Sequence, residues 1–437
     1  MIRLKKSFWW FLLLAGISFL VTRLPGLSSN PIYTRLTIAL LVILIVNGLW
    51  AVASIFGIDL QRVSRGNRKQ VREIFSENIE VINRSKIPKA WLKVSDLAEI
   101  PGGSGSRVLT WIGGRQSRTY VAHTFLQERG WFTLGPTEIE TGDIFGLFLV
   151  KKRFDTRSRL LVIPYMVNID SFPAPFGILP GGRALRQKTL EVTPYAAGVR
   201  EYVQGDPLKR IHWPSSARKQ KLIVKEFEKD PLAEVWLFLD ARSSVHYQKA
   251  TGEEPAAPDF WWLKKTRTFE LPSKTEEYAV SVTASIAKYY INQKREVGLV
   301  SAGQNYTILP AERGERQLGK ILETLAVIRP EGEMPLWGLI SSQLSHLARG
   351  STVVLITPSS DMRLMTVVME LIQRGLMPVV VLIDPASFGG ENNITELETR
   401  LINHGILTFT IRDGDDIKAK LESPHVTLDT RMIYSRF

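Results

Sequence analysis

The side chains best suited to chemistry gather in residues 198–230, which read GVREYVQGDPLKRIHWPSSARKQKLIVKEFEKD. Guanidinium groups form strong, often bidentate hydrogen bonds with carboxylates, so this segment could bind an acidic part of another protein. The alternative is structural: the charges could pair with one another and fasten two domains together, with Trp213 buried between them. The candidate partner-binding residues are Arg200, Glu201, Asp206, Lys209, Arg210, Trp213 and Arg218.

The same segment contains signals for local structure. Asp206 is a good N-cap and Pro207 fits the first helical position, which predicts a short helix from Asp206 to Trp213. Pro214 is expected to end this helix, because proline has no N–H to donate. The apolar run 222–227 then predicts a strand.

This segment resembles the signature of the bacterial "domain of unknown function 58" family. The resemblance implies an architecture with membrane spans first, then a β-domain, and a von Willebrand factor A-like domain after the signature. It also implies a partner, a MoxR-type AAA+ ATPase, but no settled activity. Lys209 and Pro214 depart from the family's usual residues. The matching residues are Arg200-Glu201-Tyr202, Gly205-Asp206, a basic pair, Ile211, Trp213 and Ala217-Arg218.

A second candidate site follows from this resemblance. Von Willebrand factor A domains bind a metal through a D-x-S-x-S loop, a distant Thr and a second Asp. The corresponding residues here are Asp240, Ser244 and Thr357, whose oxygens suit Mg²⁺. Arg242 occupies the position of the middle hydroxyl, and no acid follows Thr357 unless Asp361 supplies one. We therefore expect a degenerate site without metal or other cofactor, in which Arg242 takes the metal's place and pairs with Asp240.

Composition narrows the classes of function. The net charge of +13 predicts an anionic neighbour, either membrane lipid or nucleic acid. Acidic residues interrupt the basic signature and no nucleic-acid-binding fold is recognisable, so nucleic acid is not expected. Cysteine is absent, which excludes disulfides and Cys-ligated metals. Walker A, Rossmann and G-x-S-x-G motifs are also missing, so the chain is not expected to be an enzyme.

Two apolar runs near the N-terminus, residues 8–24 and 38–58, are each close to the roughly 20 residues of a membrane span. A cleaved signal peptide is the alternative for the first run, but no small-x-small cleavage site follows it. We expect an uncleaved hairpin in the inner (plasma) membrane. The flanking basic residues predict cytoplasmic soluble domains, and the second group is expected to face anionic headgroups. These residues are Arg3, Lys5 and Lys6 before the hairpin, and Arg62, Arg65, Arg68 and Lys69 after it.

The rest of the chain shows two kinds of periodicity. Short β-like runs separated by turn residues predict an immunoglobulin-like β-sandwich, in which Asp143 forms a turn. Later strands alternate with helices, which predicts an α/β domain with a doubly wound parallel sheet. A Trp-rich insert at 252–273 either packs on its own domain or docks onto a partner or the membrane. The expected parts are a transmembrane hairpin at 1–60, a β-sandwich at 61–170, a linker with the signature at 171–233, and a von Willebrand factor A-like domain at 234–437.

These observations predict a membrane-anchored, cytoplasm-facing interaction or scaffold protein. The family resemblance adds that it works with a MoxR-type AAA+ ATPase in the assembly or maturation of protein complexes. The alternative is a Mg²⁺-dependent adhesion or hydrolytic protein that uses the degenerate site. A purely structural envelope protein is a third possibility.

Overall fold

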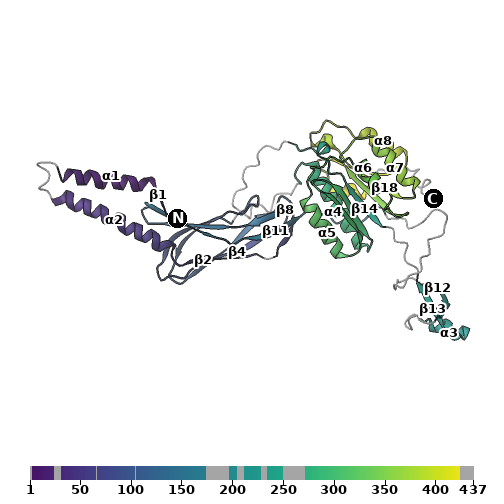
Figure 1. Cartoon of the computed structure of the whole chain (residues 1–437), viewed down its shortest axis with the longest axis horizontal. Helices are drawn as coiled ribbons and strands as arrows, with labels where there is room; N and C mark the ends of the chain where they lie inside the picture. Colours follow the sequence, from purple (N-terminus) through teal and green to yellow (C-terminus); the bar gives the residue numbers. More distant parts are fainter. Residues whose placement is uncertain are drawn as a thin grey trace. The chain divides into compact units, whose positions relative to one another are not determined.

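The computed structural model describes residues 2–23, 31–64, 66–103, 105–173, 196–203, 211–227, 234–249 and 271–423. They divide into two units, the first formed by the chain up to Ile163 and the second by the described residues that follow (Figure 1). The insert residues Phe260, Trp261 and Trp262 lie outside the described residues.

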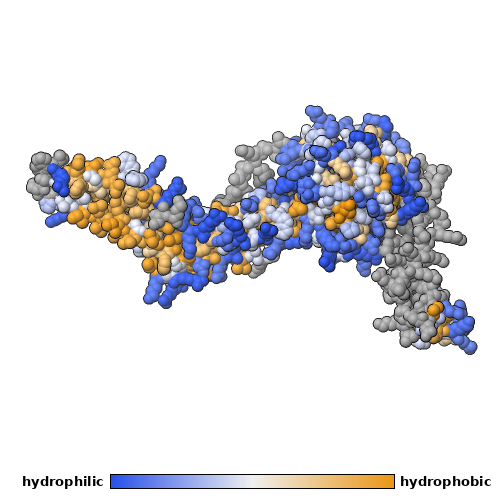
Figure 2. All heavy atoms as spheres, viewed as in Figure 1, coloured by the Kyte–Doolittle hydropathy of each residue, from blue (hydrophilic) through white to orange (hydrophobic). Residues whose placement is uncertain are grey.

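Two apolar helices, α1 (Lys6–Val21) and α2 (Pro31–Ile55), open the first unit. They pack against each other, and the Ser18 hydroxyl donates to the Tyr33 carbonyl at 3.1 Å and accepts from the Thr37 hydroxyl at 3.0 Å. Within the described chain, α2 is long and apolar enough to cross a membrane, and α1 is a shorter apolar helix. Their outward surface is almost continuously hydrophobic (Figure 2). The second apolar run was predicted to extend to residue 58, but Ile58 already begins a strand.

Three sheets follow in the first unit. Strand burial alternates, as in β4 (Ile74–Asn83), and side chains from two of the sheets share one core that includes Ile79, Val81, Leu92, Val94 and Ile139. One sheet has the order β1 (Ile2–Leu4), β10 (Phe148–Phe154), β9 (Thr137–Gly142), β5 (Lys89–Asp96), β6 (Arg107–Ile112). The others are β2 (Ile58–Ser64), β4 (Ile74–Asn83), β7 (Ser117–Phe125), and β3 (Arg68–Gln70), β11 (Ser158–Ile163), β8 (Gly130–Leu134).

Arg62 lies inside the β-domain and not at a lipid surface. Its guanidinium donates to the Glu77 carboxylate at 2.9 and 2.6 Å and to the Asp96 carboxylate at 2.8 and 3.0 Å. All three side chains are almost fully buried. Burial opposes the charge of Arg62, but the hydrogen bonds to the two acids outweigh it and raise the pKa of Arg62 above its usual value. The prediction that Arg62 faces headgroups is wrong, and Lys69 pairs with Glu73.

Replacement of Arg62 by Met should destabilise the β-domain by about 3–5 kcal/mol, because two buried carboxylates would lose their counter-charge. Thermal unfolding of the full chain in detergent would measure this loss. Arg84→Met is the matched control, since Arg84 forms a solvent-exposed pair with Asp59 on the neighbouring strand. Equal effects of the two substitutions would contradict a special role for the buried triad.

Lys89 connects the β-domain to the end of α2. Its ammonium donates to the carbonyl oxygens of Ala53 at 2.7 Å and Phe56 at 3.0 Å, and the side chain is completely buried. Carbonyls in the last turn of a helix have no partner within the helix, and a cation there also suits the helix dipole. Burial lowers the pKa of Lys89. The lysine therefore caps α2 and attaches the helix to β5.

The N-terminus is attached to the same domain. Strand β1 pairs antiparallel with β10, with Leu4 opposite Phe148. The Lys5 backbone N–H donates to the Leu147 carbonyl at 3.1 Å, and the Ser7 hydroxyl donates to the Gly146 carbonyl at 2.8 Å. Both the beginning of α1 and the end of α2 are thus fixed to one β-domain.

The Lys89→Met variant keeps most of the side-chain volume but leaves two helix-terminal carbonyls without a donor. We expect it to lose about 1–3 kcal/mol of stability. Lys93→Met, an exposed position on the same strand, should have little effect. Pulse proteolysis of the detergent-solubilised chain would compare the two, and a loss of stability no larger for Lys89→Met than for Lys93→Met would argue against the cap.

The second unit is built on a six-stranded sheet. Its order is β16 (Tyr306–Glu312), β15 (Val297–Ala302), β14 (Val235–Leu239), β17 (Thr352–Thr357), β18 (Met377–Ile383), β19 (Leu407–Ile411). All neighbours are parallel except β15 and β16. The chain proceeds outward from β14 in both directions, which is the order of a doubly wound sheet. Complete burial of β14, β15 and β17 agrees with their continuous apolar sequences.

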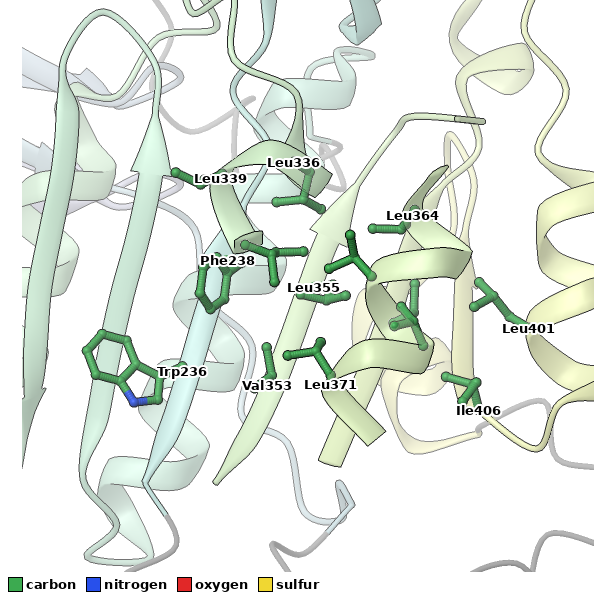
Figure 3. Packing of buried hydrophobic residues seen from close by; sticks show 14 of the residues in the cluster. Trp236, Phe238, Leu336, Leu339, Val353, Leu355, Leu364, Leu371, Leu401 and Ile406 are labelled. Atoms are coloured by element: carbon green, nitrogen blue, oxygen red, sulfur yellow. The ribbon is translucent and has the colours of Figure 1, made fainter. Parts of the chain in front are cut away.

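Helices cover this sheet. Trp236 and Phe238 of β14 pack with Leu336 and Leu339 of α6 and with Leu364 of α7 (Figure 3). Helix α4 is buried along nearly its whole length and contacts four strands of the sheet. The helices are α4 (Thr275–Asn292), α5 (Glu315–Val327), α6 (Leu336–Gln343), α7 (Arg363–Gln373), α8 (Thr395–Asn403) and α9 (Ile417–Glu422).

Candidate functional site

Asp240 follows β14 at the carboxyl end of the sheet and is 2% exposed. One carboxylate oxygen, Oδ2, accepts a hydrogen bond from the Thr357 hydroxyl at 2.6 Å. The other, Oδ1, accepts from the Arg242 backbone N–H at 3.1 Å. Thr357 Oγ1 in turn accepts from the Ser359 N–H at 2.9 Å. The sequence correctly predicted that Asp240 and Thr357 come together, because parallel neighbouring strands end at the same edge.

Arg242 does not form the predicted ion pair. Its guanidinium Nη2 donates to the Ser359 hydroxyl at 3.2 Å, and among the described residues its contact with the Asp240 carboxylate is made by the backbone N–H. Its Nε is buried and has no hydrogen-bond partner among the described residues. The Asp240 carboxylate is thus held by the Arg242 backbone N–H and the Thr357 hydroxyl, not by the Arg242 guanidinium. The arginine therefore links the β14 and β17 loops and does not take a metal's position over Asp240.

The other predicted metal-site residues do not complete a cation site. Ser244 is exposed on the short helix η2 (Ser243–Val245), whereas Asp240 and Thr357 are buried. Asp361 is held by Arg363, with Nη2 and Oδ2 at 2.8 Å, and this hydrogen bonding lowers the pKa of Asp361. In the described ranges no three His or acidic side chains gather to hold a metal.

His246 also belongs to this site, although no sequence motif singles it out. Its Nε2 lies 3.0 Å from the Asp240 carbonyl oxygen, which can only accept, so Nε2 carries the proton. Its Nδ1 lies 3.1 Å from the Thr275 hydroxyl at the start of α4. The imidazole thus ties the Asp240 loop to α4. A lone histidine six residues after the acid carries no motif that would have identified it.

Stability should depend on pH through Asp240. Burial raises the pKa of Asp240, against the opposing hydrogen bond from Thr357. A raised folded-state pKa favours the folded protein below the ordinary Asp pKa of about 4, and this contribution is lost as pH rises through the folded value. We expect the melting temperature of the second unit to fall over that range and the fall to shrink in Asp240→Asn. An unchanged pH slope in the variant would refute the assignment.

The described part of the signature forms a small local fold within the second unit. Strands β12 (Ala196–Glu201) and β13 (Ile223–Phe227) pair antiparallel, and α3 (Trp213–Lys219) lies between them in sequence. The predicted end of a helix at Pro214 is wrong: α3 begins at Trp213, and the proline lies in its first turn, where a missing N–H costs nothing. Asp206, Lys209 and Arg210 lie outside the described residues.

Ser216 holds α3 to the hairpin. Its hydroxyl accepts from the Ile223 N–H at 2.9 Å, and the His212 N–H donates to the Ile223 carbonyl at 2.7 Å. The buried Ser216 therefore stabilises the packing of α3 on the strands. It was not among the residues selected from the sequence. Serine is too common in helices and loops to mark such a role.

The signature's other described side chains point to a surface. Trp213 is 65% exposed on the small fold formed by the described signature residues. Arg218 is also exposed, in the last turn of α3. Glu201 forms an exposed ion pair with Lys221 at 3.2 Å. Arg200 lies in β12 opposite Val224.

Comparisons with known proteins agree with the signature. A family model described as "Protein of unknown function DUF58" matches residues 198–257. "Uncharacterized protein YeaD" of Bacillus subtilis (strain 168) is 24% identical over 238 residues, which are 54% of this chain and 52% of that protein. The chain thus spans about half the length of this curated relative.

Solved structures match about a quarter of the chain at low similarity. The CARDB domain of PF1109 from Pyrococcus furiosus covers 24% of this chain and 94% of its own, with a TM-score of 0.18 and 8% identity. The PapD-like domain 7 of human CEP192 covers 24% of this chain and 85% of its own, with a TM-score of 0.17 and 11% identity. Over residues 198–257, the chain is thus similar to the DUF58 family.

Proposed function

We propose that the chain is a membrane-anchored interaction protein whose signature surface binds a MoxR-type AAA+ ATPase. The observation that carries the proposal is the exposure of Trp213 next to basic residues on α3. Large exposed aromatic residues and arginines dominate the binding energy of protein interfaces. A partner surface with carboxylates would suit the cations of α3, and the acidic neighbours would limit its affinity for nucleic acid.

The two apolar helices are proposed to form a transmembrane hairpin. Pairing of β1 with β10 supports this, because it requires the N-terminus and the β-domain to lie on the same side of the bilayer. Two crossings, unlike one, return the chain to the side on which it started. The exposed basic residues Arg3, Lys5 and Lys6 favour the cytoplasmic side of a plasma membrane. Segments rich in Lys and Arg that flank a membrane span usually stay in the cytoplasm.

The two larger domains are proposed to be an immunoglobulin-like β-sandwich and a von Willebrand factor A-like domain. Support for the first is the core shared by two β-sheets. Support for the second is the strand order of the six-stranded sheet and an acid at the end of its first strand.

The alternative, a Mg²⁺-dependent adhesion or hydrolytic protein, has weaker support. Asp240 already accepts two hydrogen bonds, and Ser244 is exposed while the acid is buried. A magnesium ion needs about six oxygen ligands, so it would have to displace the Thr357 hydrogen bond and recruit water. The interaction function requires no such rearrangement.

Binding of the full chain in lipid nanodiscs to the purified ATPase tests the proposal. Trp213→Ala combined with Arg218→Ala should weaken the affinity at least about tenfold, as expected for a hot spot of roughly 2 kcal/mol. Trp131→Ala is the matched control, because Trp131 is a comparably exposed tryptophan of the β-domain, at 56%. Absence of binding by the folded wild-type chain would refute the partnership, and equal losses in both variants would refute the surface.

A further inference from the structure

The β9–β10 hairpin extends alongside the apolar helices. Lys152 of β10 donates from Nζ to the carbonyl of Ile58, just after the end of α2. Four residues earlier, Phe148 lies against Gly48, where an added Cβ would be 3.4 Å from its ring. Four residues at the strand rise of about 3.3 Å each and ten at the helix rise of about 1.5 Å each give nearly the same length. Both place the Phe148–Gly48 contact roughly 13–15 Å along α2 from Ile58. The hairpin tip therefore lies beside α2, well before its end.

This level coincides with the expected edge of a bilayer. From Pro31 to Gly48, α2 has a length of about 27 Å, close to the roughly 30 Å of a hydrocarbon core. Helix α1 begins at the same level, because Ser7 bonds to Gly146 of the hairpin tip and the Phe8 ring packs on Phe148 at 5.3 Å. Trp9 and Trp10 follow immediately and are 60% and 67% exposed. Tryptophans gather at membrane interfaces.

The tip itself exposes two large apolar side chains. Ile144 is 72% exposed and Phe145 is 63% exposed. Their loop is ordered by Asp143, a buried turn residue as the sequence predicted, whose Oδ2 accepts from the Phe145 N–H at 3.0 Å and whose Oδ1 accepts from the Phe148 N–H at 2.7 Å. An ordered loop that presents two apolar residues to water is costly unless something covers them.

Basic residues surround the same tip. Arg3, Lys5 and Lys6 are exposed, and the Lys5 N–H bonds to Leu147 of the loop. A bilayer interface consists of acyl chains followed by anionic headgroups. The apolar side chains of the tip suit the acyl chains, and the neighbouring lysines suit the headgroups. The hydrophobic surface of the two helices continues onto the adjoining part of the β-domain (Figure 2).

We propose that the loop at residues 143–147 inserts Ile144 and Phe145 into the interfacial layer of an anionic lipid bilayer, while Lys5 and Lys6 contact its headgroups. The proposal rests on the proposed membrane anchor and adds a third point of contact. The β-domain is then seated on the membrane and cannot swing freely about two helix ends.

Site-directed fluorescence can test the insertion without background labelling, since the chain has no cysteine. Full-length Phe145→Cys would carry an environment-sensitive dye in vesicles of phosphatidylcholine and phosphatidylglycerol, with or without nitroxide-labelled acyl chains. Leu41→Cys on the exposed side of α2 is the control for the anchor, and Trp131→Cys on β8 is the control for water. We expect the nitroxide to quench the dyes at positions 145 and 41 severalfold and the dye at 131 scarcely.

The outcomes separate the loop from the anchor. Quenching at 41 together with a water-like signal at 145 would overturn the insertion and leave the anchor standing. No quenching at 41 would overturn both. A blue-shifted but unquenched dye at 145 would mean that protein covers the loop, which also overturns the proposal. Quenching at 145 that persists unchanged without phosphatidylglycerol would overturn the headgroup contact.

Discussion

The attachment of the two apolar helices to the β-domain depends on the ammonium of Lys89, which is buried against the last carbonyls of α2. A helix end that leaves an apolar phase must satisfy its carbonyls, and water is excluded here by the surrounding strands. A charged donor provides this bond at the cost of its own desolvation, which the lowered pKa of Lys89 reflects. The first strand of the β-domain can then continue directly from the helix, without a flexible linker.

The secondary structure was predicted correctly from the sequence where apolar residues form a continuous or periodic pattern along a strand or helix. Continuous apolar runs such as 235–239 and 352–357 became buried strands, and the alternation of helices and strands correctly predicted the doubly wound sheet. Strand β2 was missed because the hydrophobicity of α2 continues into Ile58. Strand β1 has only three residues, and its partner β10 is remote in sequence, so no local pattern could reveal it.

The candidate sites were less predictable, because composition alone cannot say whether a charge is paired. Arg62 counted as a basic residue near a membrane, but two acids far along the chain bind it in the interior. Asp240 and Thr357 were placed together correctly by topology, whereas the direction of the Arg242 side chain depends on Ser359, 117 residues later. The exposure of Trp213 could not be read from its type, since tryptophan serves both cores and interfaces.

The antiparallel pairing of β1 with β10 sets an order of events during synthesis. The first residues of the chain cannot find their strand partner until nearly the entire β-domain has left the ribosome. At roughly 5–20 residues per second this delay is on the order of ten seconds. Closure of the N-terminal strand onto the sheet would therefore report that the β-domain is complete.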